Sequence, residues 1–157
     1  MLVVVKPPKF FVEIGLAKHD ELWTLHKAVY GLRISPRAWG TYRDETLTKL
    51  TWWADQSNKS EEKKGNKPTE FYLQQGKTDT QLWTIRSKQA GEILGALVVY
   101  VDDILLLAPH GEVRAVLIDK LRSIWKMKPQ VELTEETPIT FLGIELHRNQ
   151  EGIRLTQ

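Results

Sequence analysis

The most apolar stretch of the chain is Leu97-Val98-Val99-Tyr100-Val101-Asp102-Asp103-Ile104-Leu105-Leu106-Leu107, and two adjacent acids interrupt its middle. The residues on either side are β-branched or aliphatic without polar alternation, which is typical of strands buried on both faces. An Asp-Asp pair is a good turn sequence between such strands. The stretch therefore predicts a buried β-hairpin with Asp102 and Asp103 at the join.

The two acids need a physical reason to lie in such apolar surroundings. An ionised carboxylate there is disfavoured unless it is paired, hydrogen-bonded, solvated at a turn or bound to a cation. If the first strand stays extended through the acids, Tyr100 and Asp102 share one face of it. Two interpretations stay open on this stretch alone: a solvated turn, or carboxylates that bind a hard divalent ion such as Mg²⁺.

The composition excludes several classes of protein. The 157 residues, 41% of them apolar, suffice for one domain or a large part of one. The net charge is only +2, so any positively charged surface for nucleic acid must be confined to one part of the chain. The absence of cysteine excludes thiolate metal sites and suits an intracellular protein of the cytoplasm or the nucleus. No stretch predicts a membrane span or a signal peptide.

A helix is expected to begin after Gly31. Ser35 is a good N-cap, Pro36 suits the first helical position, and an apolar stripe follows. The residues of that stripe, all expected in the core, are Trp39, Tyr42, Leu47 and Leu50. Arg33 and Arg37 flank the helix start, where backbone N–H groups favour anions, so a phosphate site and two solvated arginines are both open interpretations.

The remaining elements indicate an α+β fold with an antiparallel sheet around the hairpin. Strands are expected at residues 2–5, from about Leu22, at 71–73 and 82–85, and at 139–147 and 153–156, with a hairpin turn at 149–152. The charged and polar composition of residues 55–70 predicts a solvated loop. A helix at about 112–126 carries one apolar face and is expected to cover one side of the sheet.

Four segments, in this order, carry a resemblance to a known family. Pro7-Pro8-Lys9-Phe10 is similar to a P-P-G-F motif, and Lys27 to Trp39 resembles K-A-L-Y-G-L-K-Q-A-P-R-A-W. Tyr100-Val101-Asp102-Asp103 is identical to a catalytic hairpin motif, and Phe141 to Leu146 resembles F-L-G-I-E-I. Together they resemble the reverse transcriptase domain of copia-type long-terminal-repeat retrotransposons.

The resemblance implies that residues 1–157 form part of a polymerase palm with part of the fingers. It implies a nucleotidyl transfer site that uses two Mg²⁺ ions in the complete parent enzyme, with weak or no binding in this fragment. The implied catalytic and metal-binding residues are Asp102 and Asp103; the implied primer- or nucleotide-binding residues are Tyr100, Val101, Gly31, Arg33, Pro36 and Arg37; and the implied primer grip is Phe141, Leu142, Gly143 and Ile144.

The implied partners are an RNA template, a DNA primer and deoxynucleotides, with integrase and ribonuclease H in the parent polyprotein and no membrane. The family's first catalytic aspartate lies before the Pro-Pro segment, and the thumb and ribonuclease H regions are expected beyond Gln157. The isolated chain is therefore expected to be inactive. The alternatives are a non-catalytic remnant, a nucleic-acid-binding module, or an unrelated metal-dependent hydrolase or structural domain.

Overall fold

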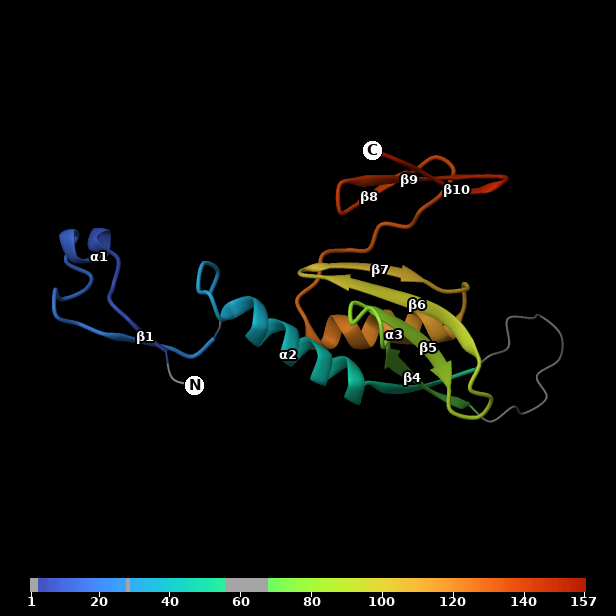
Figure 1. The fold of residues 1–157 in the computed structure, drawn as a ribbon, viewed down its shortest axis with the longest axis horizontal. Helices are drawn as coiled ribbons and strands as arrows, with labels where there is room; N and C mark the ends of the chain where they lie inside the picture. The colour runs from blue at the N-terminus through green and yellow to red at the C-terminus, as the bar shows by residue number, and fades with distance from the viewer. Residues whose placement is uncertain (1–2, 28, 56–67) are drawn as a thin grey trace. The chain divides into compact units, whose positions relative to one another are not determined.

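The computed structural model describes residues 3–27, 29–55 and 68–157, and the chain divides into two compact units, Met1–Thr46 and Leu47–Gln157 (Figure 1). Most of the predicted solvated loop, residues 56–67, lies outside the described residues. The predicted C-terminal boundary of this loop, Glu70, was wrong, because Thr69 and Glu70 belong to a strand. Thr69 pairs with Ala54, and Glu70 forms an ion pair with Lys88 at 2.7 Å.

The first unit contains a small antiparallel pair of strands. β1 (Val3–Val5) pairs with β2 (Trp23–Leu25), and the short helix α1 (Lys9–Glu13) follows the proline pair between them. The rings of Phe11 and Trp23 meet edge to face, with centroids 5.6 Å apart. The Glu21 carboxylate accepts hydrogen bonds from the Lys18 backbone N–H and from Trp23 Nε1. These two bonds, the Lys18 bond most strongly, lower the pKa of Glu21.

Helix α2 (Ser35–Lys49) begins where the sequence predicts. The N-cap role of Ser35 was wrong: this residue is already helical, and its hydroxyl donates to the Val29 carbonyl at 2.6 Å instead of accepting a backbone N–H. The predicted apolar stripe is confirmed only at its end. Leu47 and Leu50 are buried, whereas Tyr42 is 51% exposed.

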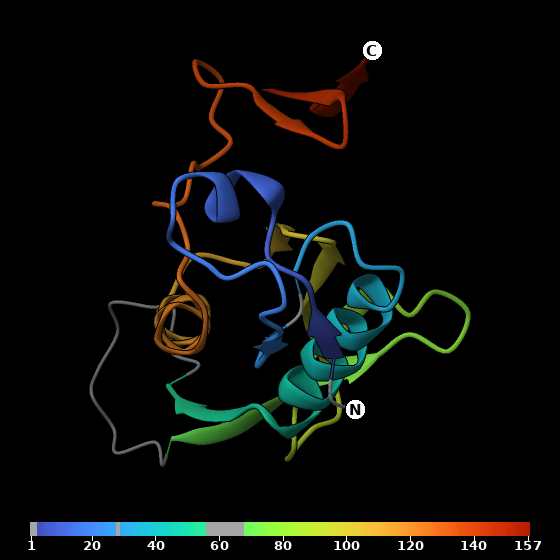
Figure 2. The same ribbon diagram turned by 90° about the vertical axis from the view of Figure 1, so that its left-hand side faces the viewer.

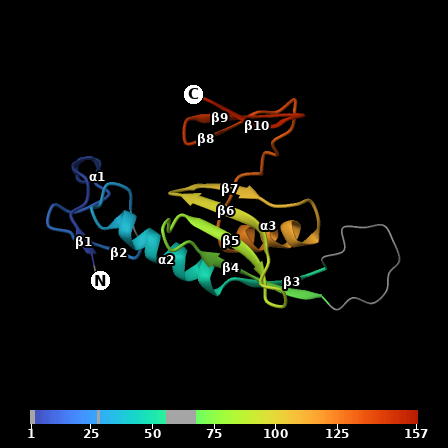
Figure 3. The same cartoon turned by 45° about the vertical axis from the view of Figure 1, so that its right-hand side comes forward.

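The second unit is built on a five-stranded antiparallel sheet in the order β3-β4-β5-β6-β7 (Figures 1 and 3). The strands are β3 (Thr51–Ala54), β4 (Thr69–Gln75), β5 (Leu82–Ser87), β6 (Ile93–Tyr100) and β7 (Asp103–Leu107). Each strand pairs with its neighbour in sequence, so the sheet is a simple antiparallel meander. This arrangement confirms the predicted hairpin within an antiparallel sheet. The prediction that its strands are buried on both faces was wrong, because only Leu97 and Val99 of β6 and no residue of β7 are buried.

One face of this sheet forms the core of the unit. It carries a continuous apolar layer made of Trp52, Phe71, Leu73, Trp83, Ile85, Leu97 and Val99. Helix α3 (Glu112–Ile124) lies against the sheet (Figure 2). Its Leu117 and Leu121 are buried and belong to the same core as this layer. The prediction of an amphipathic helix that packs on one side of the sheet is therefore confirmed, as is the α+β class.

The C-terminal strands form a separate three-stranded antiparallel sheet in the order β10-β9-β8. They are β8 (Ile139–Phe141), β9 (Ile144–Asn149) and β10 (Gly152–Thr156). The prediction of one strand over 139–147 was wrong, because Leu142 (φ 55°) and Gly143 (φ 78°) adopt left-handed conformations that fold it into a hairpin. The turn at 149–152 is confirmed, with the Asn149 side chain accepting two backbone N–H bonds.

Candidate functional site

The candidate site is the tip of the β6–β7 hairpin. β6 ends at Tyr100 and β7 begins at Asp103, so Val101 and Asp102 form a two-residue turn. Tyr100 pairs directly with Asp103, and residues opposite each other on antiparallel strands present their side chains on the same face. The expectation that Tyr100 and Asp102 share a face was therefore wrong, because the strand alternation ends at Tyr100 and Asp103 takes the position beside it.

The tip is more exposed than the residues of β6 that lead directly to it. Val99 is 1% exposed, Tyr100 is 43% exposed and Val101 is 49% exposed, and Asp102 and Asp103 are both exposed. A strand anchored in the core by Leu97 and Val99 thus ends at an exposed aromatic ring and two exposed carboxylates. This geometry suits a solvated turn and equally suits a site that must reach a large substrate.

Val101 has a strained backbone. Its φ is 49°, in the left-handed region that β-branched residues rarely adopt. Such a conformation costs about 1–2 kcal/mol, and the surrounding structure must hold the residue in it. Strained residues cluster at binding and catalytic sites, so the strain at Val101 favours a functional tip over an ordinary turn.

Asp102 and Asp103 supply the donors that a hard cation requires, but only as a pair. Within residues 3–27, 29–55 and 68–157, no group of three or more His, Asp or Glu side chains is placed to hold a metal ion. Mg²⁺ is usually bound through one or two carboxylates together with phosphate oxygens and water. The donor chemistry of the pair fits such an ion, with the other ligands coming from a substrate or from another segment.

The second group of predicted site residues surrounds the start of α2 in the first unit. Gly31 has a φ of 90°, and the Ser35 backbone N–H donates to the Leu32 carbonyl at 3.0 Å, so the chain turns tightly before the helix. Arg33, Pro36 and Arg37 are all exposed. The helix start therefore offers two accessible guanidinium groups, consistent with either an anion site or a solvated surface.

The predicted primer-grip residues form the β8–β9 turn. Phe141 pairs with Ile144, and Leu142 and Gly143 lie between them. Leu142 is 46% exposed and Ile144 is 38% exposed, so the turn presents apolar side chains at its surface. The four predicted primer-grip residues therefore lie together at one hairpin turn and not along a continuous strand.

The structure also brings together a polar cluster that the sequence analysis missed. Arg114 donates to His110 Nδ1 at 2.7 Å and to Glu132 Oε1 at 3.1 Å, and His110 Nε2 lies 3.2 Å from the same oxygen. Because arginine can only donate, Nδ1 accepts and Nε2 carries the hydrogen that His110 donates to Glu132. The Arg114 hydrogen bond is the main cause of the lowered pKa of Glu132.

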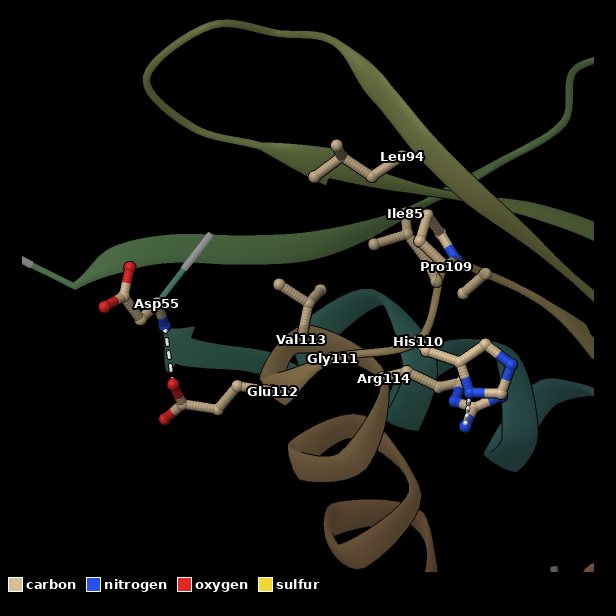
Figure 4. A pocket seen from close by; sticks show the side chains of 10 residues that line it. Asp55, Ile85, Leu94, Pro109, His110, Gly111, Glu112, Val113 and Arg114 are labelled. Atoms are coloured by element: carbon tan, nitrogen blue, oxygen red, sulfur yellow. Dashed lines mark hydrogen bonds between the residues drawn. The ribbon is translucent and has the colours of Figure 1, made fainter. Parts of the chain in front are cut away.

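A cavity of about 60 Å³ lies beside this cluster, between β5, β6 and the start of α3 (Figure 4). Ile85, Leu94 and Val113 line it together with polar groups such as Glu112, which accepts a hydrogen bond from the Asp55 backbone N–H at 3.1 Å. Its volume accommodates a few water molecules, whereas ligand pockets measure about 300–1,000 Å³. The cavity is therefore too small for a nucleotide. Only the four-residue spacing of His110 and Arg114 signals this region in the sequence.

Known proteins similar to this chain come from retrotransposons. The chain is 25% identical over 151 residues to the putative transposon Ty5-1 protein of Saccharomyces cerevisiae, covering 96% of the chain and 39% of that protein. It is 28% identical over 152 residues to the retrovirus-related Pol polyprotein from transposon RE2 of Arabidopsis thaliana, covering 97% of the chain and 8% of the polyprotein. The chain is related to retrotransposon proteins. It spans well under half the length of either relative.

The other comparisons add no assignment. The chain matches no protein-family profile, and no solved structure matches it. None of the helices in the described part of the chain is long and apolar enough to cross a membrane. The retrotransposon relatives therefore support a retrotransposon-derived origin, and the similarity to the RE2 protein is consistent with a place in a larger polyprotein.

Proposed function

We propose that this chain is part of an RNA-directed DNA polymerase, the reverse transcriptase of a copia-type retrotransposon, and that its five-stranded sheet belongs to the polymerase palm. The observation that carries the proposal is the exposed, strained turn that presents Tyr100, Asp102 and Asp103 at the end of a hairpin whose first strand is anchored in the core. The retrotransposon relatives, which align with nearly the whole chain, support it.

In this proposal the hairpin tip holds the reacting groups. The carboxylates of Asp102 and Asp103 would hold magnesium, which when bound neutralises phosphate charge and activates the primer hydroxyl. Tyr100, on the face that it shares with Asp103, contacts the primer end or the incoming nucleotide. Val101 fixes the turn that aims the two acids.

The other two groups of residues bind the substrates. Gly31, Arg33, Pro36 and Arg37 form an accessible, positively charged helix start that suits the phosphates of template and nucleotide. The Phe141 to Ile144 turn offers apolar side chains that can pack against the sugars and bases of the primer. RNA template, DNA primer and deoxynucleotides are the corresponding partners.

A third carboxylate is part of the proposal and would come from outside this chain. A two-metal site needs ligands that bridge both ions, and among the described residues no third metal-binding side chain joins Asp102 and Asp103. The relatives contain further polypeptide, since the chain covers 39% and 8% of their lengths. We therefore expect the 157 residues to lack extension activity that a longer stretch of the parent protein possesses.

Primer extension on an RNA template with Mg²⁺ tests this. The 157-residue chain is compared with a version extended upstream by the segment that would carry the third carboxylate. Extension is expected only from the longer version and is expected to be lost in Asp102→Asn, whereas Asp119→Asn, an exposed aspartate on α3, keeps it. Unchanged extension by Asp102→Asn would refute the assigned role.

A non-catalytic nucleic-acid-binding role is the second candidate, because the described residues contain no group of three or more metal-binding side chains, while Arg33 and Arg37 are exposed beside the start of α2. It predicts that the longer version binds a primer-template but does not extend it. In that case binding should weaken with salt, because phosphate contacts release counterions. Arg33→Ala combined with Arg37→Ala should then reduce the salt dependence, and a salt-independent affinity would count against this role.

A further inference from the structure

We propose that His110, Arg114 and Glu132 form a clasp that holds the segment between α3 and β8 against the start of α3, and that Arg114 thereby positions the β8–β9 turn. His110 lies in the loop between β7 and α3, Arg114 lies on the first turn of α3, and Glu132 lies in the segment that leads to β8. The clasp thus restrains the stretch that connects the β6–β7 hairpin to the β8–β9 hairpin. Its consequence for primer binding rests on the proposed function.

The three side chains of the clasp form a closed network of short contacts. Two different nitrogens of the Arg114 guanidinium take part: Nη1 donates to Glu132 Oε1 at 3.1 Å, and Nη2 donates to His110 Nδ1 at 2.7 Å (Figure 4 shows the bond to His110). His110 Nε2 lies 3.2 Å from the same Glu132 oxygen. Because a guanidinium presents its donors in a rigid planar fork, the one arginine sets the direction of both partners.

The helix that carries Arg114 is itself fixed in the core. Leu117 and Leu121 of α3 are buried there, and the Arg114 side chain is only 25% exposed, whereas those of His110 and Glu132 are 70% and 47% exposed. Exposed ion pairs usually contribute little, in part because two mobile side chains must be ordered. Here one partner is already held by its helix, so the clasp attaches an exposed segment to a fixed point.

The residues between Glu132 and β8 can transmit this restraint because they are folded into a turn. The Thr134 backbone N–H donates to the Thr137 carbonyl at 3.2 Å, and the Thr137 backbone N–H donates to Thr134 Oγ1 at 3.0 Å. Pro138, whose ring fixes its φ, then leads directly into β8 at Ile139. A segment with little backbone freedom therefore joins the clasp to the β8–β9 hairpin.

The strand β9 also lies near the clasp. The pKa of Glu132 is lowered chiefly by the Arg114 hydrogen bond, and the charge of Arg148 on β9 lowers it further. Because a positive charge shifts the pKa of an exposed carboxyl only at short range, Arg148 lies close to Glu132. Both strands that flank the β8–β9 turn are thus linked to the clasp.

The mobility of the held segment tests the clasp without an activity assay. The chain contains no cysteine, so Gln130→Cys, at an exposed position close to Glu132, gives a single site for a nitroxide spin label. Arg114→Gln is expected to convert most of the slow component of the electron paramagnetic resonance spectrum into a fast one. Arg122→Gln, which changes an exposed arginine near the other end of α3, is the matched control and should leave the spectrum unchanged.

Exchanging the two charges separates a lost contact from misfolding. Arg114→Glu and Glu132→Arg should each free the label, whereas the variant that carries both changes should regain a slow component, because a guanidinium and a carboxylate face each other again. Far-ultraviolet circular dichroism verifies that each variant is folded. The clasp is overturned if Arg114→Gln leaves the spectrum unchanged, if Arg122→Gln changes it equally, or if the exchanged pair stays as mobile as the single variants.

Primer extension by the version extended upstream tests the positioning role. Arg114→Gln should raise the KM for primer-template several-fold and leave kcat nearly unchanged, because it touches neither Asp102 nor Asp103. Arg122→Gln should keep the original KM, and the exchanged pair should recover it. An unchanged KM in Arg114→Gln would overturn the positioning role. If the unmodified version does not extend a primer, the proposed function fails and the role in primer binding fails with it, while the label spectra still decide the clasp.

Discussion

The β6–β7 and β8–β9 hairpins have the same local design in different surroundings. Each is closed by a two-residue turn whose first residue is apolar and left-handed: Val101 with φ 49° and Leu142 with φ 55°. The second residue differs, since one turn has Asp102 and the other has Gly143, with φ 78°. Glycine adopts such a conformation at little steric cost, whereas a β-branched residue does not.

The difference lies in what holds each turn in place. Leu97 and Val99 lead into the first turn, and both lie in the core beneath α3. In the second sheet Leu146 is the one buried apolar residue, at 9% exposure, and Leu155, paired with it, is 62% exposed. Strain at Val101 can therefore persist because burial fixes the strands around it, while the β8–β9 turn relies on the backbone freedom of glycine.

The largest expected contrast comes from removing a buried leucine in each sheet. Leu97→Ala should destabilise the chain by about 3–5 kcal/mol, because its rigid neighbours cannot fill the cavity. Leu146→Ala should cost about 1 kcal/mol, because its partly exposed surroundings can relax and admit water. Urea unfolding followed by circular dichroism measures both. Equal losses would show that the second sheet is as tightly packed as the first.

Two glycines separate steric crowding from backbone strain. A Cβ at Gly95 would collide with the backbone oxygen of Leu107 and lie 3.0 Å from Ala108 Cβ, so Gly95→Ala should cost about 1–3 kcal/mol. At Gly143 there is open space but a left-handed φ, so alanine should cost about 1 kcal/mol. Asparagine, which tolerates that conformation, should be nearly neutral at 143 and at least as harmful as alanine at 95. Thermal unfolding distinguishes the two patterns.

Asparagine in place of the first residue of each turn should relieve backbone strain by different amounts in the two hairpins. Val101→Asn should stabilise the chain by about 1 kcal/mol, since asparagine adopts positive φ far more readily than a β-branched residue. Leu142→Asn should gain less, because leucine is not β-branched and the surrounding sheet holds it less firmly. Midpoints of thermal unfolding measure the two gains. A loss of stability in Val101→Asn would mean that the valine side chain makes a compensating contact.

The smallest expected effect concerns Glu132, in the segment between α3 and β8. The pKa of Glu132 is lowered chiefly by the Arg114 hydrogen bond, so its stabilising contribution is present above the ordinary carboxyl pKa and is lost as the pH falls through the lowered value. Unfolding free energies measured between about pH 6 and pH 3 should fall less steeply with acid in Glu132→Gln than in the unmodified chain. Glu135→Gln, which removes an exposed acid from the same segment, is the control.

Local patterns in the sequence were sufficient to predict several elements. The β6–β7 hairpin, the start of α2 and the apolar face of α3 follow from strand runs, a Ser-Pro helix start and a helical repeat of apolar residues. The motif around Tyr100 to Asp103 also located the candidate site. β3 was missed because Trp52 and Trp53 follow α2 directly, without a turn signal that would separate helix from strand.

The sequence alone determined the α+β class, the two apolar arms around the acids, and the residues whose chemistry suits phosphate and metal. These are properties of side-chain type and spacing, which are local. Tertiary structure alone decided that Asp103 shares a face with Tyr100, that Leu142 and Gly143 split one apolar run into two strands, and that His110, Arg114 and Glu132 meet. Each of these depends on strand register or on contacts between residues distant in sequence, which no local pattern specifies.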